Sequence, residues 1–371
     1  MQHDQPRRNY RRRRKLALVL PGHNEELILG ATIDSAVVAG LSLNDIYVVD
    51  DDSSDATRRI ALSKLPKENV LTVARSGKAR AVQQAIHKFD IIQRYCWVHI
   101  ADADSIFSPH YFRIYRRHLN MRSHAAAVGF VQSMRGNWIA TYRSFSYTYG
   151  QHIFRRIQSW FGMIAVLPGP VTCFKTSIIP ELNFESGSLT EDFDLTLQIH
   201  RKRLGRIRFI PEAVNYTQDP RTIRDFYSQT LRWQRGFFQG LIAYRIGLRP
   251  RPIDLGIVYQ MSESLYYLIQ VLVIIPILVL TSASQAALWF VLLGDYAAVI
   301  VLGIFSAIAA KRPVILVALT YFYVLRFLEL AGFIQSFVEI FILRRYKHAA
   351  RGWRTEGRRY AVPAEDLRAI Q

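Results

Sequence analysis

Two long apolar segments toward the carboxyl end limit what this chain can fold into. Residues 256–280 and 286–310 are each about 25 residues long and predominantly apolar. A helix of that length crosses a hydrocarbon core about 30 Å thick. We therefore expect at least two membrane spans, preceded by a region that carries most of the charged residues.

A third apolar segment, residues 314–343, is also long enough to span but contains Arg326 and Glu329. Their spacing places them on one helical face, where a structural pair facing other helices is favoured over a transport site. If all three segments span and the N-terminal domain is cytoplasmic, the arginine-rich tail from Arg344 ends outside, against the positive-inside rule. One segment is therefore expected to be re-entrant or interfacial, so we predict two or three spans.

The composition of the 371 residues changes at 247–256, where two prolines and two arginines interrupt any helix. The formal net charge is +19. The basic residues at 7–15 favour contact with anionic lipid over nucleic acid, because no DNA- or RNA-binding motif accompanies them. The two cysteines lack a CxxC spacing, which indicates a reducing compartment. The predicted regions are a basic tail at 1–15, an α/β domain at 16–220, an amphipathic interfacial helix at 221–250, a membrane region at 251–343 and a basic tail at 344–371.

Strand and helix signals alternate in the first hundred residues. Short apolar runs predict strands at 15–22, 45–52, 69–74 and 96–104, and helical patterns follow the first three. The predicted fold class is α/β, with a mostly parallel sheet covered by helices on both faces. Such sheets bind ligands beyond the carboxyl ends of their strands. The polar residues at these ends are Asn24, Glu25, Asp50, Asp51, Asp52, Asp102 and Asp104.

Asp102 and Asp104 end the fourth predicted strand. On an extended segment both carboxylates point the same way and offer oxygens to one Mg²⁺ or Mn²⁺, with substrate phosphates completing the coordination. No glycine-rich phosphate loop follows the first strand, so a phosphate-bearing ligand needs such a cation. The alternative is a haloacid-dehalogenase-like phosphatase, in which the first aspartate is the nucleophile, but that motif commonly ends the first strand.

Six motifs occur in a fixed order between about residues 16 and 240. They are PGHNEE, VVDDDSSDAT, GKARAVQQA, ADADS, TEDFDLTLQI and QTLRW. The series resembles membrane-bound family 2 glycosyltransferases with a GT-A fold, relatives of cellulose, chitin, hyaluronan and poly-N-acetylglucosamine synthases. The resemblance implies an inverting, metal-dependent transfer of a sugar from a nucleotide sugar, expected to be a UDP-sugar, to a growing polysaccharide or glycan at the cytoplasmic membrane face.

The resemblance also implies roles for individual residues, with Asp192 as the general base and Asp194 as a reserve candidate. Thr190 is expected to cap the helix that follows it. Asp52 stands where the family usually has glycine. The implied site comprises nucleotide-sugar contacts from Pro21, Asn24, Glu25, Asp51, Lys78 and Asp102, metal ligands Asp102 and Asp104, catalytic residues Glu191, Asp192 and Arg232, and acceptor contacts Gln229 and Trp233.

The expected partners are the nucleotide sugar, the acceptor and membrane lipids. A second copy or a secretion partner is also expected, because two or three spans are few for a polymer channel. The expected location is the cell membrane, with several spans and a cytoplasmic catalytic domain. Two alternatives stay open: single addition to a lipid-linked acceptor, which the QxxRW motif disfavours, and a membrane protein that binds nucleotide sugars without turnover.

Overall fold

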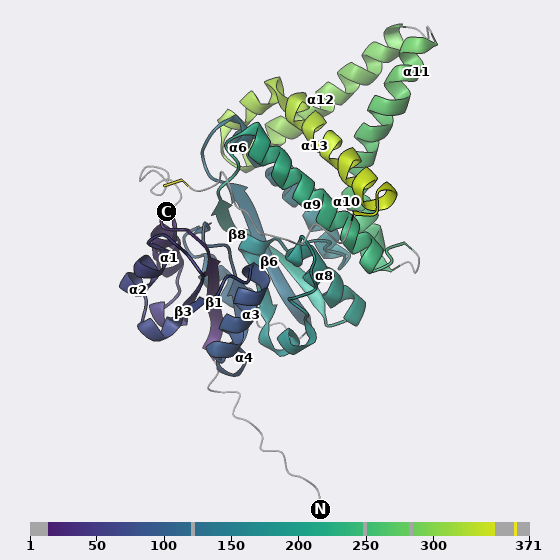
Figure 1. The fold of residues 1–371 in the computed structure, drawn as a ribbon. Coiled ribbons are helices and arrows are strands. Elements are labelled where there is room, and N and C mark those ends of the chain that lie inside the picture. The colour runs from purple at the N-terminus through teal and green to yellow at the C-terminus, as the bar shows by residue number, and fades with distance from the viewer. Residues whose placement is uncertain (1–13, 120–122, 248–250, 282–284, 346–359, 362–371) are drawn as a thin grey trace, which may run out of the picture.

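The computed structural model describes residues 14–119, 123–247, 251–281, 285–345 and 360–361. Most of the two basic tails predicted at 1–15 and 344–371 therefore lies outside the described residues. Within them, a mixed α/β domain leads into a set of long apolar helices, which project from one side of it (Figure 1).

The sheet has eight strands in the order β3-β2-β1-β4-β7-β6-β8-β5. Its first half is parallel, as predicted. β1 pairs in parallel with β2 on one side and with β4 on the other, and β2 pairs in parallel with β3. Five of the six residues of β4, Tyr95–Ile100, are buried, as expected of a strand covered on both faces. The other three strands of this half are β1 Arg14–Gly22, β2 Ile46–Asp51 and β3 Val70–Val73.

The second half of the sheet departs from a purely parallel arrangement. The short strand β7 pairs antiparallel with both β4 and β6, whereas β6 and β8 are parallel to each other. The sheet is therefore mixed. The four strands of this half are β5 Ile106–Phe107, β6 His124–Ser133, β7 Thr172–Lys175 and β8 Arg206–Thr217.

Helices cover both faces of the sheet, as the alternating pattern predicts. The first core contains side chains of α3 Lys78–Lys88, α4 Ile91–Arg94 and α8 Glu191–Lys202. The core on the other face contains side chains of α1 Leu29–Val38 and α5 Tyr111–His118, together with Ala61. The remaining helical segments of this domain are α2 Thr57–Lys64, α6 Trp138–Tyr149, η4 Gly150–Arg155, α7 Arg156–Trp160, α9 Ile223–Ala243 and the short turns η2 Leu43–Asp45, η3 Lys67–Asn69, η5 Gly169–Val171 and η6 Thr176–Glu181.

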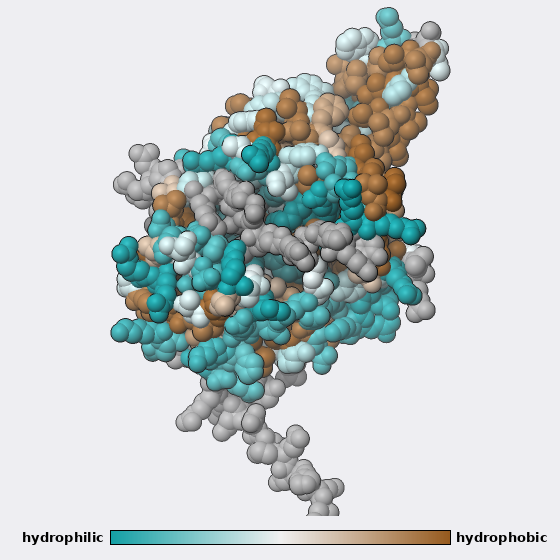
Figure 2. Space-filling view, viewed as in Figure 1, coloured by the Kyte–Doolittle hydropathy of each residue, from teal (hydrophilic) through white to brown (hydrophobic). Residues whose placement is uncertain are grey.

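Two helical stretches match the predicted spans. One runs from Pro252 to Leu280 through a π-helical turn and has 29 residues, and the other is α12, with 25 residues. They form a hairpin whose surface is mostly apolar (Figures 1 and 2). The elements are α10 Pro252–Ile269, η7 Gln270–Ile274, α11 Ile275–Leu280 and α12 Gln285–Ala309.

The third apolar segment is broken. Helix η8, Pro313–Thr320, is bent by 69° relative to the helix Phe322–Ile342, which consists of α13 Phe322–Phe337 and η9 Val338–Ile342. The described residues therefore contain two helices long and apolar enough to cross a membrane, or three if the bent pair is one span. This count agrees with the prediction of two or three.

Helix α9 joins the α/β domain to the apolar helices. It packs against α8 and α13 (Figure 1). Gly240 allows the close approach, because a side chain there would overlap the ring of Phe193 on α8. The amphipathic helix predicted at 221–250 thus has several protein-facing residues, among them the buried Gln229 and Phe238.

Candidate active site

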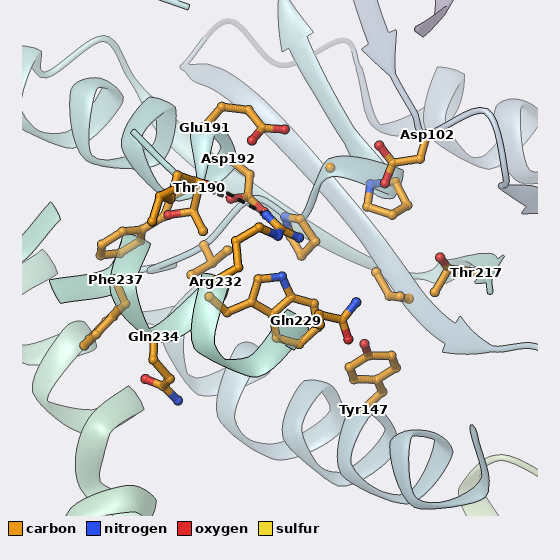
Figure 3. A pocket seen from close by; sticks show the side chains of 18 of the residues that line it. Asp102, Tyr147, Thr190, Glu191, Asp192, Thr217, Gln229, Arg232, Gln234 and Phe237 are labelled. Carbon is orange, nitrogen blue, oxygen red and sulfur yellow. Dashed lines mark hydrogen bonds between the residues drawn. The ribbon is translucent and has the colours of Figure 1, made fainter. Parts of the chain in front are cut away.

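A cavity of about 1300 Å³ lies between the carboxyl ends of the strands, α8, α9 and the apolar helices. It contains most of the charged residues named from the sequence. Figure 3 shows the side chains of Asp192 and Arg232 turned toward each other, with Asp102 across the cavity. The predicted site residues that line it are Glu25, Lys78, Asp102, Asp104, Glu191, Asp192, Gln229, Arg232 and Trp233.

Asp102 and Asp104 both line this cavity, but not from a strand. β4 ends at Ile100, and a turn closed by the Ser105 amide, which donates to the Asp102 carbonyl, carries the two aspartates. The expectation of an extended segment is therefore wrong in this detail. Ala103 is buried between them, as expected.

Lys78 links the aspartate turn to α8. Its ammonium lies 2.6 Å from Asp102 Oδ1 and 3.0 Å from Glu191 Oε1. Burial opposes the charged form, but the two carboxylates raise the pKa of Lys78 above its ordinary value. Gly169 makes room for this pair, because a Cβ there would stand 2.6 Å from Lys78 Nζ and 3.5 Å from both Asp102 oxygens.

The residues present fit a divalent cation that shares its coordination with a ligand. No group of three or more His, Cys, Asp or Glu side chains in the described part of the chain forms a complete metal cage. Mg²⁺ commonly takes one or two carboxylates and fills its remaining positions with water and substrate phosphates. Asp102 and Asp104 would be those carboxylates, and the Lys78 ammonium already lies where Asp102 attracts a positive charge.

Glu191 and Asp192 occupy the first turn of α8. Burial and the neighbouring charge of Glu191 raise the pKa of Asp192 to about 6. Burial also works against ionised Glu191, but the charges of Lys78 and Arg232 lower its pKa below the ordinary value. The two adjacent carboxyls thus have opposite shifts, so Glu191 holds cations while Asp192 is able to exchange a proton near neutral pH.

One expectation about α8, the Thr190 cap, does not hold, and Asp194 is engaged in other contacts. Thr190 is the N-cap residue, but its side chain makes no capping hydrogen bond. Asp194, the reserve candidate for the base, is 5% exposed and accepts hydrogen bonds from Gln198 and from the Tyr244 hydroxyl. Its Oδ1 thus holds α8 to the end of α9, and its Oδ2 is bonded within α8.

The expected nucleotide-binding loops are arranged mainly by contacts with each other. Asp51 is fully buried and accepts hydrogen bonds from the Ser76 and Gly77 amides, which positions the loop before Lys78. The Asn24 side chain accepts from the Ser54 amide. Pro21, Asn24 and Asp51 do not line the cavity, whereas Glu25 does.

Asp52 occupies a backbone conformation that explains the family's preference for glycine. Its φ is 61°, in the left-handed region. Glycine reaches this region without steric cost, and aspartate is among the few other residues that tolerate it. The turn geometry is therefore kept, and the Asp52 side chain is exposed.

Helix α9 brings Gln229, Arg232 and Trp233 to the cavity. Arg232 donates a hydrogen bond to the Leu189 carbonyl, just before α8, and its charge acts on both Glu191 and Asp192. Gln229 is 8% exposed and accepts a hydrogen bond from Arg143 at 3.3 Å. The three residues therefore face the cavity from α9, and Arg232 acts on the α8 carboxylates.

Arg143, on α6, belongs to no sequence motif and was not predicted. Its guanidinium lies between the Phe226 and Trp233 rings, 4.5 and 4.8 Å from their centroids. It also donates to Glu329 on α13 at 3.3 Å. Arg143 thus connects the QxxRW helix to the apolar helices.

The cavity continues between α10 and α13. Arg326 donates to Glu329 at 3.1 Å, so the predicted pair exists, and it also lies 3.3 Å from Glu263 on α10. Glu263 was not singled out from the sequence, although an acid inside an apolar helix is a recognisable signal. All three side chains line the cavity, so the pair faces open space as well as other helices.

Comparison with known proteins identifies the family. The sequence model described as "Glycosyl transferase family group 2" matches residues 97–328, well over half of the chain. A probable glycosyltransferase, YdaM, from Bacillus subtilis is 28% identical over 249 residues, which cover 62% of this chain and 57% of that protein. A poly-beta-1,6-N-acetyl-D-glucosamine synthase from Staphylococcus aureus is 22% identical over 240 residues, covering 61% and 55%. The match thus spans little more than half the length of these relatives.

Among solved structures, the mannosyltransferase PcManGT from Pyrobaculum calidifontis, in complex with GDP-Man and Mn²⁺, has a similar fold. Its TM-score is 0.53 at 18% identity, and the likeness covers 83% of this chain and 86% of that one. The fold is therefore GT-A, as predicted.

Proposed function

The chain belongs to glycosyl transferase family group 2, and we propose that it transfers a sugar, with inversion, from a nucleotide sugar to a glycan acceptor. The observation that carries this proposal is the meeting of two groups in one cavity. Asp102 and Lys78 lie at the strand ends, and Asp192 and Arg232 lie on α8 and α9. Inverting transfer needs one base for the acceptor hydroxyl and positive charge for the departing diphosphate.

Each residue has a distinct task in this proposal. Asp192 takes the proton of the acceptor hydroxyl, for which its pKa of about 6 leaves it mostly ionised at neutral pH. Arg232 and Lys78 attract the diphosphate. Asp102 and Asp104 would hold Mg²⁺ or Mn²⁺, which when bound supplies further positive charge to the leaving group. Glu191 keeps Lys78 in place.

The nucleotide end of the donor is expected near Glu25 and the loop held by Asp51. Pro21 and Asn24 do not line the cavity, and they would act indirectly by fixing the shape of that loop. Gln229 and Trp233 would border the acceptor. A UDP-sugar is the expected donor.

The acceptor is proposed to be a growing polysaccharide rather than a lipid phosphate. In the membrane-side part of the cavity, Arg143 and Arg326 are paired with the carboxylates of Glu263 and Glu329. This pairing offsets the positive charge that a phosphate-bearing lipid needs, whereas an uncharged glycan can bind such a wall through its hydroxyls.

The apolar helices support a reaction at a membrane. The α10–α12 hairpin and the bent third segment would anchor the α/β domain on the cytoplasmic face, with membrane lipids around them. A second copy or a secretion partner would complete a path for the polymer.

Incubation of membranes containing the full chain with radiolabelled UDP-sugars tests the proposal. High-mass, glycosidase-sensitive product supports polymer synthesis, whereas product found only in the organic extract supports single addition to a lipid. Asp192→Asn should keep nucleotide binding and lose transfer. Transfer by this variant at the wild-type rate would refute the assignment of the base, and nucleotide-sugar binding without any turnover by wild type would favour a binding protein.

A further inference from the structure

A second cavity, of about 460 Å³, lies at the amino-terminal ends of β6 and β8. These strands run parallel to each other and start at the edge of the sheet opposite the active site. Two arginines and a histidine line the cavity, and its described lining residues include no carboxylate. The cavity is therefore basic and separate from the site of the proposed transfer.

The basic side chains gather because they come from paired strands. Arg206, the first residue of β8, is the register partner of His124, the first residue of β6. Arg208 lies two residues further along β8, and alternate residues of a strand point to the same face. Partial burial and the charges of Arg208 and Arg206 lower the pKa of His124 below its ordinary value. A concave surface with two such arginines attracts anions.

The positive field continues onto the end of α5. Partial burial and the charges of Arg208 and Arg117 lower the pKa of His118, whereas the exposed carboxylate of Glu212 acts in the opposite direction. The basic region thus extends beyond the cavity itself. This extent suits a surface that carries many anionic groups better than a single small ion.

Two aromatic side chains project beside this cavity and help to line it. Trp160, the last residue of α7, is 78% exposed, and Phe161, which follows it, is 70% exposed. Among the large apolar side chains that the structure describes, only Leu280 and Phe290 on the apolar hairpin are more exposed than Trp160. Large rings left in water lose the free energy that their burial would give, so the exposed pair indicates a contact surface.

The aromatic pair lies next to the beginning of the first apolar span. Pro252, the first residue of α10, lines the same cavity. Gln158 on α7 donates to the Gly256 carbonyl, which fastens α7 to the first turns of α10. The exposed apolar side chains of α10 begin at Leu255, and α11 lies at the far end of the hairpin (Figure 1). The aromatic pair therefore lies where this span would enter a bilayer.

We propose that the basic cavity binds the phosphate of an anionic phospholipid from the leaflet in which α10 begins, with Trp160 and Phe161 inserted among the neighbouring lipids. Arginine donates paired hydrogen bonds to phosphate oxygens, and tryptophan is enriched where acyl chains meet headgroups. The inference rests on the apolar helices lying in a bilayer and requires no sugar transfer. The bound lipid would fix the orientation of the α/β domain against the membrane surface.

Native mass spectrometry of the detergent-solubilised full chain, titrated with phosphatidylglycerol or phosphatidylcholine, tests the basic cavity. In the double variant Arg206→Gln/Arg208→Gln, the affinity for the first phosphatidylglycerol should fall roughly tenfold to thirtyfold, as for two arginines facing anionic lipid. The affinity for phosphatidylcholine should not change. An unchanged affinity for phosphatidylglycerol in this variant would overturn the inference.

The control is the double variant Arg58→Gln/Arg59→Gln, which removes the same charge from exposed positions on α2. It should bind phosphatidylglycerol as wild type does, and an equal loss in both double variants would mean that only net charge matters. If the Tm of Arg206→Gln/Arg208→Gln falls, the exposed Arg206 is replaced alone, with an expected loss of about fivefold.

Tryptophan fluorescence of the full chain in nanodiscs tests the aromatic pair. The difference between the emission of wild type and that of Trp160→Phe reports Trp160 itself, and phospholipids brominated near the headgroup should quench it. Trp289→Phe verifies the assay, because Trp289 lies exposed on α12 and should be quenched in any bilayer. Emission from Trp160 that stays unquenched while Trp289 is quenched would place the pair in water and overturn the inference.

A different polyanion is the remaining occupant to exclude. Fluorescence anisotropy of a labelled single-stranded RNA, measured with the detergent-solubilised full chain, should give the same affinity for wild type and Arg206→Gln/Arg208→Gln. A loss of RNA affinity in this variant with phosphatidylglycerol affinity retained would assign the cavity to nucleic acid instead. None of these measurements depends on turnover, so their failure leaves the proposed transfer untouched.

Discussion

The Lys78 ammonium lies 2.6 Å from Asp102 Oδ1, so a side chain from α3 already neutralises the aspartate that is expected to bind a metal. The same ammonium contacts Glu191 at 3.0 Å. A divalent cation and Lys78 therefore compete for Asp102 unless a diphosphate draws the ammonium away. This competition would make metal binding depend on the nucleotide.

Lys78→Met is expected to bind Mn²⁺ more tightly than wild type when no nucleotide is present. The gain should be about tenfold, equivalent to roughly 1.4 kcal/mol, because the competing ammonium is gone. Affinity for UDP should fall, since Lys78 attracts the diphosphate. Electron paramagnetic resonance of free Mn²⁺ and isothermal titration of UDP measure the two effects.

Arg80→Met is the control for this prediction. Arg80 lies on the same helix, and its guanidinium pairs with Glu185 instead of Asp102. Its loss should leave Mn²⁺ affinity at the wild-type value. An unchanged Mn²⁺ affinity in Lys78→Met would show that the two cations do not compete.

Transfer should be lost as the pH falls through about 6. The base must be ionised, and the pKa of Asp192 is raised to about 6 by burial and by Glu191. In Glu191→Gln the like charge is absent, so the acid limb of the kcat/KM profile should move to lower pH. A profile measured from pH 4.5 to 8.5 on both proteins checks this, and a limb that stays in place or moves upward contradicts it.

Asp192→Asn should also make the protein more stable at pH 7. The pKa of Asp192 is higher in the folded protein, about 6, than in the unfolded chain, near 4. The protonated carboxyl therefore contributes stability that is fully present below about pH 4 and is lost as the pH rises through about 6. At pH 7 the buried charge therefore costs free energy, about 1–3 kcal/mol. Asparagine removes that cost. Chemical denaturation should show a gain at pH 7 that shrinks toward pH 4, and a loss of stability at pH 7 would contradict this account.

Arg143 should affect the acceptor more than the donor. It lies between the Phe226 and Trp233 rings and donates to Gln229 and Glu329. Arg143→Lys keeps the charge but loses the planar group that stacks and donates on two sides. We expect the KM for the acceptor to rise about tenfold, the KM for the donor to stay within about twofold, and kcat to fall less than kcat/KM.

A double-mutant cycle with Glu329→Gln tests whether Arg143 acts through α13. Coupled residues give a double variant that is less impaired than the product of the single effects. The control is Arg156→Met, which removes an exposed arginine outside the cavity. Equal losses for donor and acceptor in Arg143→Lys would indicate a general disturbance of the fold.

The first half of the sheet could be predicted because its strands are short buried runs separated by helical patterns. Glu25, Asp102 and Asp104 could be placed together for the same reason, since parallel strands end at one edge. Lys78 was named only from the family resemblance. Strand β7 was missed. It has four residues, Thr172–Lys175, and it lies antiparallel between β4 and β6, so neither its length nor its position along the chain indicates its neighbours.

The connection between the cavity and the membrane helices could not be predicted. Arg143 and Glu329 are 186 residues apart, and only the packing of α6 against α13 brings them together. Glu263 and Asp295 were not singled out from the sequence either, although both are acids within apolar segments. Asp295 accepts hydrogen bonds from Tyr266 and Tyr323, which joins α12 to its neighbours.

Gly169→Ala should weaken donor binding without unfolding the protein. An added Cβ would stand 2.6 Å from Lys78 Nζ and 3.5 Å from both Asp102 oxygens, so the flexible lysine has to move away from the aspartate. Because the backbone there does not need a positive φ, alanine is otherwise accommodated. We expect the KM for the UDP-sugar to rise about tenfold, as for the loss of one charged contact, with little change in Tm. Gly294→Ala is the control, because a Cβ on that helical glycine meets nothing within 4 Å. An unchanged donor KM in Gly169→Ala would mean that Lys78 need not occupy its observed position for the donor to bind.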